Sequence, residues 1–169
     1  EIGAVCVAGH SVGEFSALYA AGVLGLEDVF RGVAARGSIM NALAEETEGA
    51  MYAIKGIDRD SLAALMDSHA AADWIDVAND NSPRQQVVSG TRSAFKEWLP
   101  VLLHAGFEQV RLPVNGAWHS ALMRKGVEEF QVVIDGLRFA DPMLPMFTNQ
   151  SAAALTAAEQ IKHDLVSNL

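Results

Sequence analysis

The sequence predicts an α/β protein whose larger part surrounds a parallel sheet and whose middle forms a separate βαββαβ unit. Near the start, the apolar run Ala4–Ala8 gives way to apolar residues at helical spacing, as at a strand-to-helix junction. Residues 49–112 show the pattern strand, helix, strand, strand, helix, strand. Hydrophobic residues make up 50% of the 169 positions, which is enough for a substantial core.

The first predicted element is a strand over Ala4–Ala8. Val5 and Val7 are β-branched, and an uninterrupted apolar run suits a strand buried on both faces of a parallel sheet. Cys6 lies inside this run, so we expect a small buried hydrophobe there rather than a reactive thiol.

A G-x-S-x-G turn, Gly9-His10-Ser11-Val12-Gly13, follows the strand and leads into a helix. So tight a turn favours residues without Cβ on both sides of the serine, since a side chain would collide with the strand or the helix. Ser11 is then presented at a helix N-terminus, where backbone N–H groups favour a developing oxyanion. An ordinary turn with Ser11 as the helix N-cap is the alternative.

The longer string GHSVGEFSALYAAGVL resembles the nucleophile region of malonyl-CoA:acyl carrier protein transacylases and of the acyltransferase domains of fatty-acid and polyketide synthases. The hallmark of that family is G-H-S-x-G-E followed by an alanine-rich helix. The resemblance implies that Ser11 is the acyl-accepting nucleophile and that the N–H of Val12 contributes to the oxyanion hole. It also places His10 among the substrate-binding residues.

The next helix is predicted over Leu26–Ala44, after a turn at Gly22–Gly25. Within it, the string from Arg36 to Met40 matches an R-G-x-x-M string of the same family. The resemblance implies that Arg36 pairs with the free carboxylate of malonate and that Met40 lies in the substrate site. A planar guanidinium can hold a carboxylate with two parallel hydrogen bonds. A helix-surface arginine is the alternative.

The inserted unit, residues 49–112, has the element order of a ferredoxin-like fold. A loop at Asn79–Pro83 resembles the N-x-N-S-P string that edges the family's cleft, which implies a substrate-binding role for Asn81. A plain turn explains the same residues. The predicted strands are Ala50–Ile57, Trp74–Ala78, Gln86–Ser89 and Glu108–Leu112, and the predicted helices are Asp58–Ala71 and Thr91–Ala105.

The second catalytic candidate is His119, in the string PVNGAWHSALM. This string resembles the family's return to its large domain, and the resemblance implies that His119 is the general base for Ser11. A lone histidine is more often a packed or capping residue. The resemblance also implies that Trp118 is substrate-binding. In synthase acyltransferases a bulky aromatic at this position tends to accompany unbranched malonyl substrates, so we expect a malonyl rather than a methylmalonyl substrate.

The remaining elements complete the larger part of the chain. We expect a helix over Ser120–Leu137, a strand near Leu144–Thr148 and a helix from Thr156. Residues 1–48 and 113–169 are thus predicted to form an incomplete, α/β-hydrolase-like catalytic subdomain. The resemblance implies a strand and an oxyanion-donating loop before this point, so we expect an internal piece of a longer protein.

Composition narrows the classes of function. No apolar stretch is long enough for a membrane span, no signal peptide is recognisable, and one cysteine rules out a disulfide within the chain, so we expect a cytoplasmic enzyme. A net charge of −9 argues against nucleic acid. It also means that docking of an acidic acyl carrier protein would need a local basic patch.

The resemblance implies transfer of a malonyl group from coenzyme A to the phosphopantetheine thiol of an acyl carrier protein, through an acyl-serine. Coenzyme A thioester would be a substrate, and neither a bound cofactor nor a metal is expected. Two alternatives stay open: a serine esterase or thioesterase of α/β-hydrolase or patatin type, and a catalytically silent docking domain.

Overall fold

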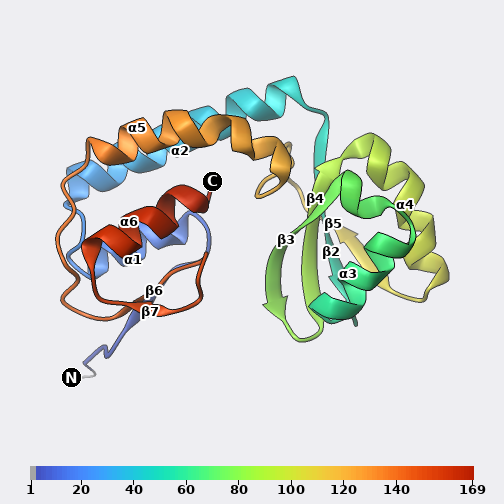
Figure 1. The fold of residues 1–169 in the computed structure, drawn as a ribbon, viewed down its shortest axis with the longest axis horizontal. Helices are drawn as coiled ribbons and strands as arrows, with labels where there is room; N and C mark the ends of the chain where they lie inside the picture. Colours follow the sequence, from blue (N-terminus) through green and yellow to red (C-terminus); the bar gives the residue numbers. More distant parts are fainter. Residues whose placement is uncertain (1–2) are drawn as a thin grey trace. The chain divides into compact units, whose positions relative to one another are not determined.

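The computed structural model describes residues 3–169, apart from the side chain of Ala72, and divides the chain into two compact units (Figure 1). The first unit contains the N-terminal residues up to Ile39 together with Gly126–Leu169, and the second contains Met40–Lys125. Helix α2, Leu26–Glu46, is shared between them.

The first unit has a small mixed sheet in the strand order β1-β6-β7. Strand β1 runs parallel to β6, with Val7 opposite Met146, and β6 pairs with β7 in antiparallel fashion. The predicted parallel pairing is therefore present, but β7 was not expected. The strands are β1 (Val7–Ala8), β6 (Met146–Phe147) and β7 (Ala154–Leu155), and the other helices are α1 (Gly13–Ala20), α5 (Val127–Asp135) and α6 (Ala158–Ser167).

The prediction for the first strand was wrong in its extent and its burial. Only Val7 and Ala8 pair with another strand, Val5 is 81% exposed, and Cys6 is exposed rather than buried. The physical reason is that, in the part of the chain that the structure describes, β1 has β6 as its one neighbouring strand. The apolar run therefore lacks the cover that a central strand receives.

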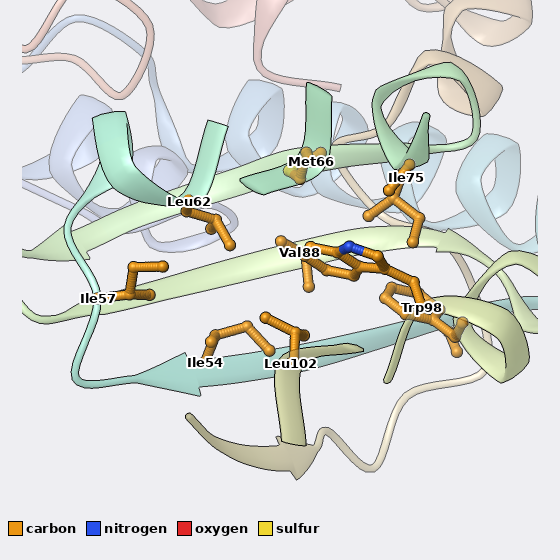
Figure 2. Packing of buried hydrophobic residues seen from close by; sticks show 11 residues of the cluster. Ile54, Ile57, Leu62, Met66, Ile75, Val88, Trp98 and Leu102 are labelled. Carbon is orange, nitrogen blue, oxygen red and sulfur yellow. The ribbon is translucent and has the colours of Figure 1, made fainter. Parts of the chain in front are cut away.

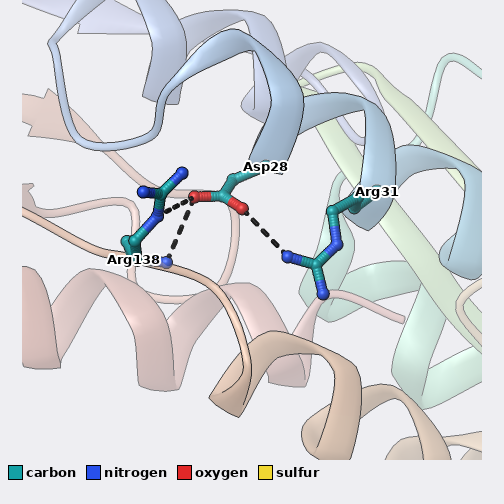
Figure 3. Close-up of polar contacts among 3 residues, drawn as sticks. All are labelled: Asp28, Arg31 and Arg138. Carbon is teal, nitrogen blue, oxygen red and sulfur yellow. Dashed lines mark hydrogen bonds and ion pairs between the residues drawn. The ribbon is translucent and has the colours of Figure 1, made fainter.

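A buried carboxylate connects the start of α2 to the segment that follows α5 (Figure 3). Asp28 is 1% exposed and accepts hydrogen bonds from the backbone N–H of Arg138 at 3.3 Å and from its Nε at 3.4 Å. The Nη1 of Arg31 adds a bond of 3.3 Å. Burial alone would raise the pKa of Asp28, but the hydrogen bonds and charges of Arg138 and Arg31 outweigh it and lower that pKa.

The second unit is a four-stranded antiparallel sheet in the order β3-β4-β2-β5, formed in the chain order βαββαβ. The central pair, β2 and β4, is in register from Gly49 opposite Thr91 to Lys55 opposite Gln85. The strands are β2 (Gly49–Lys55), β3 (Ile75–Ser82), β4 (Gln85–Thr91) and β5 (Glu108–Arg111), and the helices are α3 (Arg59–Ser68) and α4 (Arg92–His104), with a short 3-10 helix η1 (Ala71–Asp73).

The core of this unit lies between the sheet and its two helices (Figure 2). Ile54 and Val88 come from the central strands and are fully buried against Leu62 of α3 and Leu102 of α4. Phe95 lies in the same core, and its ring centroid is 4.7 Å from that of Tyr52. Both helices begin as the sequence predicts, with the side chains of Asp58 and Thr91 accepting backbone N–H groups.

Two predicted boundaries were wrong. Residues 79–82 belong to β3 instead of a loop, because they pair with β4 through two irregularities in register, and only Pro83 and Arg84 separate the strands. The helix predicted over Ser120–Leu137 is a 3-10 helix, η2 (Ala121–Gly126), followed by α5. Among the described residues, no helix combines the length and the apolar character needed to cross a bilayer.

Candidate active site

The turn between β1 and α1 holds Ser11 in a left-handed backbone conformation, with φ 50°. A Cβ added to Gly9 would lie 2.0 Å from the carbonyl oxygen of Gly13, so this position requires glycine. Gly13 has open space on its Cβ side. The predicted need for glycine on both sides of the serine is thus confirmed for Gly9 and wrong for Gly13.

The hydroxyl of Ser11 faces a buried arginine. Arg36 Nη2 donates to Ser11 Oγ at 3.0 Å and to the carbonyl oxygen of Asn168 at 3.2 Å. The N-cap of α1 is Val12, so Ser11 does not take the N-cap position that the alternative interpretation gave it. A nucleophile candidate and a guanidinium that could bind an anion therefore lie side by side within the first unit.

Arg36 itself is 6% exposed, so the alternative of a helix-surface arginine is wrong. Burial lowers the pKa of its guanidinium, and the negative charge of Glu14 partly offsets this effect. An arginine keeps its charge under such a shift because its ordinary pKa is so high. The site therefore contains a fixed positive charge with little water around it.

Glu14, three residues after the serine, is fully buried. Its Oε2 accepts hydrogen bonds from Asn149 Nδ2 at 2.6 Å and from Asn168 Nδ2, while its Oε1 has no hydrogen-bond partner among the residues that the structure describes. Burial raises the pKa of Glu14 to about 6; Asp164 adds to the rise, and the bonds from the two asparagines oppose it.

Asn149 bonds to the turn on both sides of His10. Its Oδ1 accepts the backbone N–H of Ser11 at 2.9 Å, and its Nδ2 donates to the carbonyl oxygen of Gly9 at 2.7 Å. Asn168 Nδ2 adds a long contact of 3.5 Å to the carbonyl oxygen of Ser11. The backbone of the turn is therefore held by side chains that come from residues far along the chain.

Sequence reasoning missed the roles of Glu14, Asn149 and Asn168. One signal could have found Asn149: it stands just after the predicted strand Leu144–Thr148, and the turn with Ser11 stands just after β1. The carboxyl ends of neighbouring parallel strands meet at one edge of a sheet, so residues there come together. Asn168 follows no pattern of this kind.

Other predicted site residues lie as follows. His10 and Val12 are exposed in the turn, with Val12 at 51%, and Met40 is buried on α2, one turn after Arg36. Asn81 is exposed on β3.

His119 and Trp118 belong to the second unit, in the segment between β5 and η2. His119 is half-buried and has a left-handed backbone, with φ 59°. The ring of Trp118 lies against Gly116, where an added Cβ would come within 2.4 Å of it, and lines a cavity of about 610 Å³ together with Arg92 and Arg111. Within residues 3–169, no three His, Cys, Asp or Glu side chains gather closely enough to hold a metal ion.

Comparison with known proteins decides the family. The profile of the acyl transferase domain matches residues 4–161. This chain belongs to the acyl transferase domain family. The expected resemblance is therefore confirmed, and it covers nearly the whole chain.

Individual members of the acyl transferase family agree with this assignment. The malonyl CoA-acyl carrier protein transacylase of Bacillus subtilis (strain 168) is 36% identical over 164 residues, which is 96% of this chain and 52% of that protein. Polyketide synthase GfsB of Streptomyces halstedii is 41% identical over 155 residues, 92% of this chain and 3% of the synthase. The chain spans about half the length of the transacylases it matches.

Solved acyl transferase structures share the fold. One, a type II polyketide synthase acyl carrier protein in complex with its malonyl-transacylase, matches with a TM-score of 0.92 and 34% identity, covering 99% of this chain and 55% of that chain. FabD from Acinetobacter baumannii matches with a TM-score of 0.91 and 30% identity, covering 99% and 54%. The α/β architecture, with one mixed and one antiparallel sheet, is thus that of known acyl transferases.

Proposed function

We propose that the protein containing this chain moves a malonyl group from coenzyme A to the phosphopantetheine thiol of an acyl carrier protein, in fatty-acid or polyketide synthesis. The observation that carries the proposal is the bond of 3.0 Å from the buried guanidinium of Arg36 to Ser11 Oγ, on a left-handed turn. The similarity to transacylases whose names include malonyl-CoA and acyl carrier protein supports the same substrates.

The proposed chemistry is transfer in two half-reactions. Ser11 Oγ attacks the thioester carbonyl of malonyl-CoA while His119 takes its proton, and the backbone N–H of Val12 donates to the oxyanion. The C–S bond breaks, and His119 returns the proton to the departing thiolate of coenzyme A. The carrier-protein thiol then gives its proton to His119, attacks the ester and releases Ser11 with its proton restored.

Arg36 would hold the free carboxylate of the malonyl group. In malonyl-serine one methylene separates the ester carbonyl from that carboxylate, so a guanidinium beside Ser11 Oγ lies within reach of it. A buried guanidinium that binds a carboxylate with two N–H groups gains both charge and geometry. This arrangement favours malonyl over acetyl.

The finer assignments belong to the same proposal. His10, Met40, Asn81 and Trp118 would contact substrate, with Trp118 favouring malonyl over methylmalonyl. The inserted subdomain, residues 49–112, would be ferredoxin-like. Its strand order β3-β4-β2-β5 supports this, as do the connections, in which α3 lies between β2 and β3 along the chain and α4 lies between β4 and β5. Residues 1–48 and 113–169 would form the α/β-hydrolase-like catalytic subdomain.

The test is mass spectrometry of the full-length protein after incubation with malonyl-CoA. We expect one malonyl adduct on Ser11 and none in Ser11→Ala, because the hydroxyl is the proposed nucleophile. Ser16→Ala is the matched control, since Ser16 is exposed on the same segment and should leave the adduct intact. An adduct elsewhere, or an undiminished one in Ser11→Ala, would overturn the assignment. Hydrolysis of p-nitrophenyl acetate without transfer to a carrier protein would favour the esterase alternative.

The second arm of this experiment compares malonyl-CoA with acetyl-CoA in Arg36→Ala. Loss of the guanidinium should slow acylation by malonyl-CoA and shift the preference towards acetyl-CoA. Arg36→Lys keeps the charge but loses the planar pair of donors, so we expect an intermediate preference. Unchanged selectivity in Arg36→Ala would rule out the carboxylate role.

A further inference from the structure

The proposed transfer gives no role to Glu14 or Asn149, yet both lie against the turn that carries Ser11. Asn149 contacts the turn through two bonds: its Oδ1 accepts the N–H of Ser11 at 2.9 Å, and its Nδ2 donates to the carbonyl oxygen of Gly9 at 2.7 Å. These two backbone groups lie on either side of the bend. Asn149 therefore satisfies one backbone N–H and one backbone carbonyl of the turn, as the backbone of a neighbouring strand would.

The bend needs such support because of its conformation. A serine with φ 50° is in the left-handed region, which residues with a Cβ rarely adopt without help from their surroundings. A hydrogen bond to the N–H of Ser11 itself acts directly on that residue. Its loss would release the serine towards ordinary backbone conformations and move Oγ.

The carboxylate of Glu14 decides which way the amide of Asn149 points. A carboxylate only accepts hydrogen bonds, so the NH₂ end of the amide must face Oε2, at 2.6 Å, and the oxygen end is left to face the N–H of Ser11. Both hydrogens of Asn149 Nδ2 are then used, one by Glu14 and one by Gly9. If the amide were reversed, it would set its NH₂ group against the N–H of Ser11.

Contacts of the preceding residue hold the backbone of Asn149 in place. The preceding residue, Thr148, is bound through its Oγ1 to Asp164 Oδ2 at 2.6 Å and to the hydroxyl of Ser151 at 2.8 Å. Thr148 and Asp164 are both buried. The loop that carries Asn149 is therefore anchored to helix α6, so the side chain starts from a fixed backbone.

The same carboxylate oxygen of Glu14 is also connected, through Asn168, to Arg36, the proposed substrate-binding residue. It accepts from Asn168 Nδ2, and the carbonyl oxygen of Asn168 accepts from Arg36. The charged groups that act on Glu14 are Arg36 on α2 and Asp164 on α6. One buried carboxylate is thus linked to the turn and to the guanidinium beside it.

We propose that Asn149 and Glu14 are positioning residues, with Asn149 holding the backbone of Ser11 in its left-handed conformation and Glu14 fixing the direction of the Asn149 amide. The effect on catalysis rests on the proposed acyl transfer at Ser11. The effect on the backbone conformation of Ser11 is independent of that proposed reaction.

Two measurements on the full-length protein test this proposal. The first is amide hydrogen exchange of the Ser11 N–H by NMR without substrate. Asn149→Ala should speed that exchange by about tenfold or more, because the N–H loses its acceptor. The second is the rate of malonyl-Ser11 formation, which should fall by about 10- to 100-fold while KM for malonyl-CoA stays within about threefold, since misplacement of the nucleophile affects chemistry more than binding.

Glu14→Gln is the second variant, because it keeps the volume of the side chain, removes its charge and replaces one acceptor oxygen with a donor NH₂ group. We expect Glu14→Gln to speed exchange of the Ser11 N–H and to slow malonyl-Ser11 formation, each by less than Asn149→Ala does. Gln131→Ala is the matched control: Gln131 Nε2 donates to Asp135 Oδ1 at 2.9 Å, an exposed bond of the same chemistry within the first unit. It should change neither measurement.

The outcomes separate this proposal from the proposed function. Unchanged exchange of the Ser11 N–H in Asn149→Ala or, should that variant not fold, in Glu14→Gln would overturn the positioning role. Faster exchange with an unchanged rate of acylation would overturn its link to catalysis. A wild-type protein that forms no malonyl adduct would refute the proposed function, and the exchange measurement would still decide whether Asn149 holds Ser11.

Discussion

The apolar core of the second unit and the polar cluster around Ser11 are built on different physical principles. In the core, aliphatic and aromatic side chains from β2, α3 and α4 pack together with no charge among them. In the first unit, Glu14, Arg36, Asn149 and Asn168 are joined by directed hydrogen bonds, and two of the four bear charge. Packing is tolerant of direction and scales with buried area, whereas each polar contact depends on a particular atom.

This difference predicts different consequences of mutation. Removing atoms from the apolar core should always lower stability, because burial of apolar area is favourable there. Removing a buried charge from the polar cluster can raise stability, because transfer of a carboxylate out of water is costly. In the first unit, a mutation can therefore raise the free energy of unfolding while it slows the reaction. In the core of the second unit, we expect truncations only to lower the free energy of unfolding.

The largest expected effect is from Phe95→Ala in the core of the second unit. Phe95 is 1% exposed, and such truncations typically reduce the free energy of unfolding by about 3–5 kcal/mol. Leu103→Ala is the control on the same helix, since Leu103 is 69% exposed and should change stability by less than about 0.5 kcal/mol. Urea denaturation followed by CD would measure both, and equal losses would contradict the packing of this core.

An effect of opposite sign is expected for Glu14→Gln in the polar cluster. The pKa of Glu14 rises from its ordinary value of 4.5 to about 6 on folding, so the folded state binds the proton more tightly than the unfolded state. Ionised Glu14 therefore lowers stability, fully above pH 6 and progressively less as the pH falls towards 4.5. At pH 8 the variant should be more stable by up to roughly 2 kcal/mol.

The measurement is the free energy of unfolding of wild type and Glu14→Gln at pH 8 and at pH 4.5. The advantage of the variant should shrink at the lower pH, while acylation at pH 8 is slower than in wild type. A variant that is less stable than wild type at pH 8 would show that the carboxylate stabilises the fold, and the contrast between the two regions would fail.

The same contrast explains what the sequence could predict of the fold. The second unit was predicted well because its signals are local: alternating apolar residues, Asp58 and Thr91 before helices, and Gly106, with φ 84°, after one. The end of β3 was not, because Asn79–Ser82 have the composition of a turn and are kept in the strand by pairing with β4. Pairing across the hairpin overrides the turn preference of these residues there.

In the site, the sequence pointed to Ser11 and Arg36 through short strings, and the structure brings those two together. It did not point to the contact between Glu14 and Asn149, which joins residues separated by 135 positions. A hydrogen bond between distant residues leaves no period and no spacing in the sequence. Where no such string marks the residues, the polar contacts that sequence reasoning finds are those between near neighbours.

Thr91 tests this last point and carries the smallest effect. Its Oγ1 accepts the N–H of Ala94 at 3.2 Å, a polar contact that spans three residues and satisfies one donor at the start of α4. Thr91→Ala should reduce the free energy of unfolding by about 1 kcal/mol, measured by urea denaturation, and Thr91→Ser should restore most of it because the hydroxyl is kept. Acylation of Ser11 should not change in either variant. A slower acylation would mean that local capping in one unit and the long-range polar cluster in the other are coupled, and the two regions could no longer be treated as separate.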